Sequence, residues 1–283
     1  MKKFFAFALA LILALSLLGC AKTDAPAADG NEGGEPASDP VVLTVGASVT
    51  PHAEILNAVA DKLLADYNIQ LKVVEYTDYV QPNLATESGE LDANYFQHLP
   101  YLESFNEEQG THLVSVAAIH YEPFSIYPGR SASLDDIPDG AIISVPNDGT
   151  NEARALQLLE ANGIITLREG AGLSATKLDI VENPHNVEIM EIEAAQLTIS
   201  LPDVDFACIN VNYALQGGLS VAKDALVSEN KDSEAAETFA NIIAVKEGNE
   251  KNEAILALCK VLKSEECRQF IESSYNGEVI PMF

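Results

Sequence analysis

Hydrophobic positions from residue 41 onward alternate between short apolar runs and stripes with helical spacing. Val41 to Ala47 is an apolar run of the β type. Thr50 and Pro51 follow it as a predicted N-cap and first helical residue. The helix that they begin carries its apolar face at Ile55, Leu56, Val59 and Leu63. Strands at residues 71–76, 91–96 and 112–119 and a helix at 99–109 come next, and this order predicts a mainly parallel, doubly wound sheet.

A second set of elements begins near Glu122. Its short β segments are expected at residues 124–127, 141–145, 178–181, 187–192 and 204–209, with a helix at 150–162. Residues 242–245 form a further strand that could cross back to the first unit, and two helices near 252–263 and 264–274 end the chain. We therefore expect two α/β lobes, the first formed by residues 41–122 and 240–283 and the second by residues 123–239.

The first forty residues have the pattern of an exported lipoprotein. Two lysines precede an apolar run from Phe4 to Leu18, which is shorter than the roughly 20 residues of a membrane-spanning helix. The run ends in LLGC, which resembles a bacterial lipobox, so residues 1–19 are predicted to be a signal peptide and Cys20 the lipidated first residue of the mature chain. An uncleaved anchor helix is the alternative, and the length of the run disfavours it.

Residues 21–40, which follow the lipobox cysteine, contain no valine, isoleucine, leucine, phenylalanine or tyrosine, so residues 20–40 comprise the lipidated cysteine and this segment. Such a segment cannot bury enough surface to offset the entropy of ordering, which predicts a disordered tether. The folded part would then hang from the extracytoplasmic face of the cell membrane by the lipid on Cys20. A formal net charge of −27 argues against nucleic acid as a partner.

Polar and aromatic residues follow four of the predicted strands. In open parallel sheets, ligands bind outside the carboxyl ends of the strands, so these residues are expected to meet at one cleft. The segments are SVTPH at residues 48–52, QHLPY at 97–101, PNDGTN at 146–151 and NVNY at 210–213. They include His52, Asn151 and Asn212 as candidate ligand-binding residues.

Arg154 lies about one turn inside the helix that Gly149 and Thr150 open. Free N–H groups at a helix N-terminus favour an anion, and a guanidinium fork matches a carboxylate. The segment therefore predicts a site for a ligand carboxylate. A surface ion pair of Arg154 with Glu152 or Asp148 explains the same residues equally well.

Aromatic side chains gather in two nearby segments of the sequence. Tyr79 closes the turn TDYVQP, and Phe96, His98 and Tyr101 occur in DANYFQHLPYL. Three aromatic rings and an imidazole can enclose an apolar or thioether chain. Core packing is the alternative, and for Phe96 taken alone it is the better one.

Several blocks together resemble one known family. The stretches VGASVTPHAEIL, TDYVQPN, GELDANYFQHLPYL, ISVPNDGTNEARAL, DIVENPHNVEIMEIEAAQL and FACINVNYAL are similar to successive blocks of the methionine-binding lipoproteins, the MetQ/NlpA family. The resemblance implies a type II periplasmic-binding-protein fold, in which two doubly wound α/β lobes close on one ligand. It implies a substrate-binding lipoprotein that delivers methionine to the permease and ATPase subunits of an ABC importer, and it leaves the D form open beside the L form.

The resemblance also assigns roles within the candidate site. By this resemblance, Arg154 binds the ligand carboxylate and Asn210 contacts the polar groups of the ligand backbone. The thioether pocket is implied to consist of Tyr79, Phe96, His98 and Tyr101. No cofactor, metal or catalytic residue is implied. The sequence departs from the family pattern at Gly149 and near Thr198 and Ile199, and relatives that bind methionine-containing dipeptides keep that ligand class open.

Three other classes of protein compete with a solute receptor for an organic ligand. An enzyme is disfavoured because the sequence contains no GxSxG, P-loop, HExxH or GxGxxG motif. A metal receptor is disfavoured because no two of the five histidines lie at metal-ligand spacing. A purely structural surface protein does not need polar clusters at four strand ends.

Overall fold

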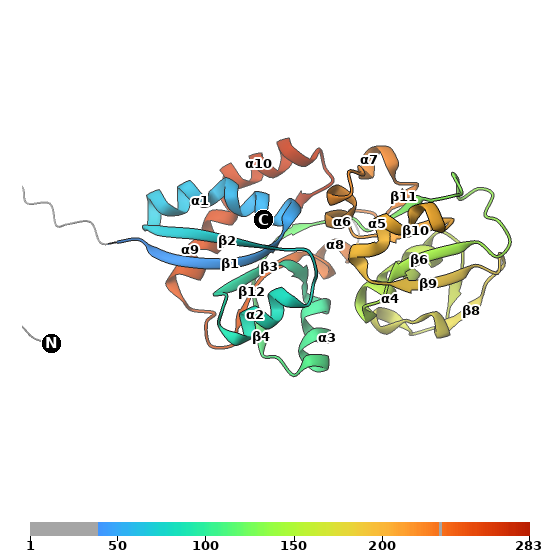
Figure 1. The fold of residues 1–283 in the computed structure, drawn as a ribbon, viewed down its shortest axis with the longest axis horizontal. Helices are drawn as coiled ribbons and strands as arrows, with labels where there is room; N and C mark the ends of the chain where they lie inside the picture. The colour runs from blue at the N-terminus through green and yellow to red at the C-terminus, as the bar shows by residue number, and fades with distance from the viewer. Residues whose placement is uncertain (1–38, 232–233) are drawn as a thin grey trace, which may run out of the picture. The chain divides into compact units, whose positions relative to one another are not determined.

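The computed structural model describes residues 39–231 and 234–283. The predicted signal peptide, Cys20 and nearly all of the predicted tether lie outside the described residues. From residue 39 onward the chain folds into two α/β lobes, each built around its own sheet (Figure 1). No helix in the described part of the chain is long and apolar enough to span a membrane.

The sheet of the first lobe has six strands in the order β13-β4-β12-β3-β1-β2. β1 is parallel to both β2 and β3, whereas β12 and β13 run antiparallel to their neighbours. The sheet is therefore mixed, where a mainly parallel one was predicted, because the chain returns from the second lobe and adds strands in the opposite direction. The strands are β1 (Val41–Ser48), β2 (Ile69–Tyr76), β3 (Ala93–His98), β4 (Leu113–Tyr121), β12 (Asn241–Lys246) and β13 (Ile280–Pro281).

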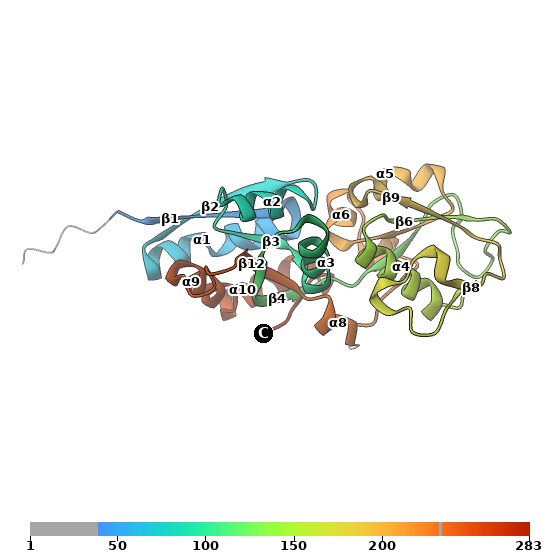
Figure 2. The same ribbon diagram turned by 90° about the horizontal axis from the view of Figure 1, so that it is seen from below.

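Helices cover both faces of this sheet (Figures 1 and 2). Apolar residues of α1 (Glu54–Tyr67), α9 (Glu253–Leu262) and α10 (Glu265–Tyr275) form one core with β1. On the other face, α3 (Leu99–Gln109) contributes Leu102 to a smaller cluster with β4 and β12, and α2 (Gln81–Ser88) packs against β3. The predicted apolar stripe of the first helix is buried as its spacing indicated.

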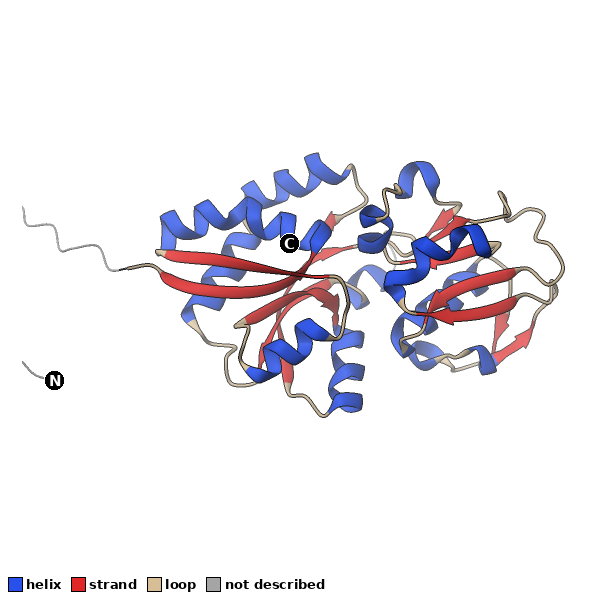
Figure 3. Cartoon of the chain, in the orientation of Figure 1, coloured by secondary structure: helices blue, strands red, loops and turns tan. Residues whose placement is uncertain are grey.

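The second lobe contains a five-stranded sheet in the order β11-β5-β10-β6-β9 (Figure 3). Its main helix, α4 (Gly149–Ala161), packs its apolar side onto β6 and β10. The strands are β5 (Ser125–Pro128), β6 (Ile142–Pro146), β9 (Glu188–Ile192), β10 (Phe206–Ile209) and β11 (Val227–Ser228). Smaller elements are the pair β7 (Thr166–Leu167) and β8 (Ile180–Glu182), and the short helices α5 (Leu197–Ser200), α6 (Val211–Gln216), α7 (Val221–Asp224) and α8 (Glu234–Thr238).

The chain crosses between the two sheets twice. It leaves the first sheet after β4 and enters the second at β5, so Glu122 lies on the outgoing crossover. It returns between β11 and β12, so Glu229 lies at the start of the return crossover. Glu122 contacts both lobes, because its carboxylate accepts hydrogen bonds from His120 in the first and from the backbone N–H of Asn212 in the second.

The ends of two predicted elements differ from the prediction, and helix α2 was not predicted. Thr50 has extended backbone angles, φ −136° and ψ 142°, inside an irregular turn, Val49–Ala53, and the regular helix α1 begins only at Glu54. Pro51, His52 and Ala53 are buried, so packing of this turn overrides the local capping signal. In addition, β3 extends to His98, so Gln97 and His98 are the last residues of that strand rather than the residues after it.

Candidate functional site

A cavity lies between the two lobes, and its empty space of about 360 Å³ includes space that is open to the solvent. Eight of the nine ligand-binding residues predicted from the sequence line it, and His52 is the exception. The lining consists of Tyr79, Phe96, Gln97, His98, Tyr101, Glu122, Phe124, Asn151, Arg154, Asn210, Val211, Asn212 and Asn241.

The aromatic end of the cavity is formed by the first lobe. The ring of Tyr79 lies 5.6 Å from that of Phe96 and 5.7 Å from that of Tyr101, between centroids. The Tyr101 hydroxyl donates a hydrogen bond to the backbone oxygen of Tyr79 at 3.2 Å, which fixes the two segments relative to each other. These rings offer edges and faces to an unbranched apolar or thioether chain.

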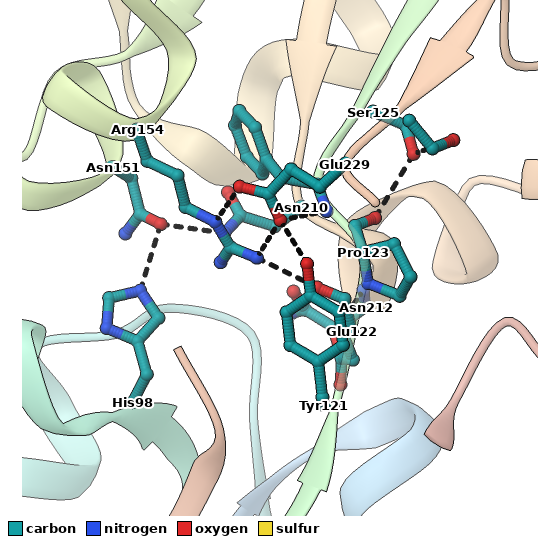
Figure 4. Close-up of polar contacts among 12 residues, drawn as sticks. His98, Tyr121, Glu122, Pro123, Ser125, Asn151, Arg154, Asn210, Asn212 and Glu229 are labelled. Atoms are coloured by element: carbon teal, nitrogen blue, oxygen red, sulfur yellow. Dashed lines mark hydrogen bonds and ion pairs between the residues drawn. The ribbon is translucent and has the colours of Figure 1, made fainter. Parts of the chain in front are cut away.

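A chain of amide hydrogen bonds joins the lobes at the centre of the cavity (Figure 4). Asp148 is the N-cap residue of helix α4. Asn151 donates to the Asp148 carboxylate from its backbone N at 3.0 Å and from its side-chain Nδ2 at 2.8 Å. Its side-chain oxygen Oδ1 bonds His98 Nε2 of the first lobe at 3.2 Å and accepts Asn210 Nδ2 of the second at 2.9 Å. Asn151 therefore sets the orientation of both neighbours, and the structure places it beside Asn210 as the strand-end argument predicted.

His98 is a neutral hydrogen-bond donor in this network. Its Nδ1 accepts the backbone N–H of Tyr101 at 3.2 Å, so the ring proton belongs on Nε2, which faces the Asn151 carbonyl oxygen. Burial, and after it the nearby charge of Arg154, lowers the pKa of His98 to about 3. The ring therefore carries no charge at neutral pH.

Arg154 projects from α4 into the cavity, where a carboxylate of the second lobe holds it. Its Nε and Nη2 donate to the two carboxylate oxygens of Glu229 at 2.8 Å and 2.6 Å, and Nη2 also donates to the backbone oxygen of Glu122 at 2.9 Å. None of these bonds involves the other terminal nitrogen of the guanidinium group, Nη1. The guanidinium carbon lies 4.2 Å from the ring centre of Phe239 and 5.1 Å from that of Phe124. Arg154 is thus fixed in place before any ligand arrives.

The partners that the sequence suggested for Arg154 have other roles. Asp148 caps the N-terminus of α4, so the helix end that was expected to attract a ligand carboxylate already carries a carboxylate of its own chain. Glu152 accepts the backbone N–H of Lys177 at 2.9 Å. The partner is Glu229, which lies 75 residues along the chain from Arg154. The arginine is therefore a buried cavity residue rather than part of a surface ion pair with its own helix.

Two side-chain atoms of the cavity are buried and have no hydrogen-bond partner among the residues that the structure describes. They are the oxygen Oδ1 of Asn210, an acceptor, and the nitrogen Nδ2 of Asn212, a donor. Asn212 is oriented by the Tyr79 hydroxyl, which donates to its Oδ1 at 2.6 Å, and burial raises the pKa of that phenol well above its usual range. Buried polar groups are nearly always paired, so this unpaired acceptor and donor beside Arg154 indicate a ligand with polar groups of both kinds.

His52 lies behind the cavity wall in a cluster that the sequence analysis did not predict. Sequence spacing brought no two histidines together, yet ligand-type atoms of His52, His120 and Glu122 lie within 4.8 Å of one another. His120 Nε2 is 2.7 Å from Glu122 Oε1, and His52 Nε2 is 2.9 Å from Asn241 Oδ1. These are direct hydrogen bonds that a metal ion would have to break, so the cluster supports the wall formed by Glu122 and Asn241.

The charges of this cluster follow from its burial. Burial lowers the pKa of His120 to about 3, and it lowers that of His52 to about 4 despite the opposing field of Glu122. Burial also raises the pKa of Glu122, which His52 and the backbone N–H of Asn212 partly offset. Both imidazoles are therefore neutral near pH 7, and they act as hydrogen-bonding groups.

Sequence reasoning missed Glu122, Glu229 and Asn241. None of them sits in a motif: Glu122 and Glu229 lie on the crossovers, and Asn241 is the first residue of β12. The one usable signal was position, because Glu122 lies at the predicted lobe boundary and Asn241 at the start of the predicted returning strand. Polar residues on the crossovers are therefore candidates for the site, as those at strand ends are.

Comparison with known proteins shows what the chain is similar to. The family model described as NlpA lipoprotein matches residues 43–283. The methionine-binding lipoprotein MetQ of Bacillus subtilis is 40% identical over 287 residues, which is 100% of this chain and 99% of that protein.

Two solved structures share both sequence and fold. A lipoprotein from Ruminococcus gnavus is 61% identical with a TM-score of 0.84, over 86% of this chain and 99% of that one. A nutrient-binding protein from Burkholderia cenocepacia, solved bound to methionine, is 41% identical with a TM-score of 0.81, over 85% of this chain and 100% of that one.

Proposed function

The chain belongs to the NlpA lipoprotein family, and from that premise we propose that it is the extracytoplasmic substrate-binding component of an ABC importer for methionine. The proposed ligand site is the cavity between the lobes, with Tyr79, Phe96, His98 and Tyr101 around the side chain and Arg154 and Asn210 on the polar end. Asn151 and Asn212 complete the polar end. The lobes are residues 41–122 with 240–283, and residues 123–239.

The observation that carries the proposal is the set of unsatisfied groups at one end of an aromatic cavity. Asn210 Oδ1 is a buried acceptor without a partner, which suits an ammonium group. Asn212 Nδ2 is a buried donor without a partner, and together with Arg154 Nη1 it suits a carboxylate. An α-amino acid carries both groups on one carbon, and the aromatic rings that line the same cavity suit an unbranched thioether chain.

Contacts across the cavity connect ligand binding to closure of the lobes. The Tyr79 hydroxyl reaches Asn212, and His98 reaches Asn151, in each case from the first lobe to the second. A ligand that contacts both sides stabilises the closed arrangement by its difference in affinity for the closed and open forms. The permease would then recognise the closed, loaded protein, a role that requires binding and release and no bond-making chemistry.

Specificity for methionine is tested by a thermal-shift panel of the twenty amino acids, norleucine and the dipeptide Gly-Met. Methionine or Gly-Met is expected to raise the melting temperature most. Sulfur-to-ring contacts contribute only about 0.3–1.5 kcal/mol, so norleucine should bind measurably but more weakly. Glutamate and lysine should have no effect, because the residues proposed to surround the ligand side chain, Tyr79, Phe96, His98 and Tyr101, are all neutral and would leave a second charge unpaired. Stabilisation by glutamate, lysine or a divalent metal ion, with none from methionine or Gly-Met, would refute the assignment.

The lipid anchor is tested separately at Cys20. Cys20→Ala is expected to move the protein from the membrane fraction to the soluble fraction, since two acyl chains on one cysteine supply the membrane affinity. Fractionation and the mass of the N-terminal peptide measure this. Cys259→Ala, which removes a cysteine of the folded part, is the matched control and should stay on the membrane. If the Cys20 variant remains membrane-bound and the wild-type peptide carries no acyl mass, the anchor is not at this residue.

A further inference from the structure

Glu229 is the counter-charge of the cavity's arginine, and it lies behind Arg154 on the return crossover (Figure 4). Both of its carboxylate oxygens accept hydrogen bonds from Arg154, at 2.8 Å and 2.6 Å. Oε2 also accepts the Tyr121 hydroxyl at 2.6 Å and the backbone N–H of Phe124 at 2.9 Å. The side chains of Arg154 and Glu229 are only 4% and 10% exposed. The pair is therefore buried, and four hydrogen bonds fix its geometry.

The ion pair determines the charge that a ligand meets. Arg154 is the only cation among the described residues of the lining, and Glu229 neutralises it. Burial alone would raise the pKa of Glu229. The charge and hydrogen bonds of Arg154 outweigh this effect of burial, and the pKa of Glu229 is therefore lower than usual. His98 is neutral, and Glu122 adds a second carboxyl group to the wall. No uncompensated positive charge remains among these residues to receive a lone carboxylate.

This balance has a consequence for the class of ligand. A ligand with a carboxylate and no ammonium would bring a net negative charge against Arg154, whose own charge Glu229 already neutralises, and burying an uncompensated charge is costly. A zwitterion brings one charge of each sign. Its carboxylate can share Arg154 with Glu229, while its ammonium finds the unpaired oxygen of Asn210.

We propose that Glu229 is a specificity-determining residue: by neutralising Arg154 it restricts the cavity to ligands that carry an ammonium group together with the carboxylate, and it excludes the 2-hydroxy acid with the same side chain. The inference rests on the proposed function, because methionine is its reference ligand. An arginine without this partner would attract the amino acid and the hydroxy acid alike, since both present the same carboxylate.

The test compares two probes by calorimetry, L-methionine and 2-hydroxy-4-(methylthio)butanoate. They differ only in ammonium against hydroxyl, and the hydroxyl can still donate to Asn210. The wild-type protein is expected to bind methionine at least about 100-fold more tightly than the hydroxy acid. The unpaired Asn210 oxygen can accept a hydrogen bond from a charged ammonium group, which the hydroxy acid lacks. In Glu229→Gln this ratio should shrink by about tenfold or more, mainly through a gain for the hydroxy acid.

The control is Glu188→Gln, which removes an exposed carboxylate from the same lobe and should leave the ratio as in wild type. An unchanged ratio in Glu229→Gln that still binds methionine would overturn the inference. Affinities of the two probes for the wild-type protein that agree within about threefold would also overturn the inference. This comparison does not depend on whether a variant folds. A wild-type protein that binds no methionine would instead remove the proposed function, and this inference with it.

Discussion

Replacing Arg154 with alanine is expected to weaken methionine binding by about 30-fold to several thousandfold. The guanidinium is buried in the cavity, and removing one partner of a buried, hydrogen-bonded charge pair costs about 2–5 kcal/mol of binding. The same change should also lower the melting temperature, because it leaves Glu229 buried without its counter-charge. Calorimetry measures the first effect and thermal unfolding the second.

Two further variants separate binding from folding. Arg154→Ala combined with Glu229→Gln removes the stranded carboxylate, so part of the lost stability should return while the affinity stays low. Arg168→Ala removes an arginine of the same lobe that is 65% exposed and paired with Asp179, and it should leave affinity unchanged. Equal methionine affinity in wild type and Arg154→Ala would reject Arg154 as the carboxylate anchor.

Replacing Asn210 with alanine is expected to weaken methionine binding by about 10- to 150-fold. Asn210 directly follows β10, and its unpaired Oδ1 is the acceptor assigned to the ligand ammonium. A hydrogen bond to a charged group contributes about 1.5–3 kcal/mol, whereas the neutral bond from its Nδ2 to Asn151 contributes about 1 kcal/mol to stability. Affinity should therefore fall much more than the melting temperature does.

The matched control for this variant is Asn147→Ala. Asn147 is an exposed asparagine of the same lobe, just before α4, and does not line the cavity, so its removal should change affinity by less than about twofold. A second check uses the hydroxy acid analogue, which presents a neutral donor and should lose less affinity than methionine in Asn210→Ala. A methionine affinity within threefold of wild type would show that Asn210 does not hold the ammonium.

Local pattern was sufficient for most of the secondary structure, and it failed where packing competes with it. The apolar stripe of α1 is buried as its spacing predicted, because burial of one helix face follows directly from 3.6-residue periodicity. The predicted start of α1 was wrong, because His52 forms a buried hydrogen bond with Asn241, which is 189 residues away. Helix α2 was not predicted because its buried face includes Asn83 and Thr86, whose polar character conceals the helical period.

The sequence by itself determined the class of fold and most of the cavity lining. Residues at the carboxyl ends of strands meet wherever an α/β sheet leaves a cleft, so Asn151, Asn210 and Asn212 could be located from strand positions alone. The block around Arg154 and the aromatic block could be recognised as similar to the family because each is a continuous stretch of sequence. Recognising them did not require knowledge of how the strands connect.

Only the tertiary structure decided which charges face one another. Arg154 pairs with Glu229 rather than with a neighbour on its helix, and Glu122 joins two histidines of the first lobe to the backbone of Asn212 in the second. These partners lie on irregular crossovers, where no hydrophobic period marks a residue as buried. Their positions depend on strand order and on the path of the returning chain. An ion pair over 75 residues and a hydrogen bond over 90 residues leave no trace in local spacing.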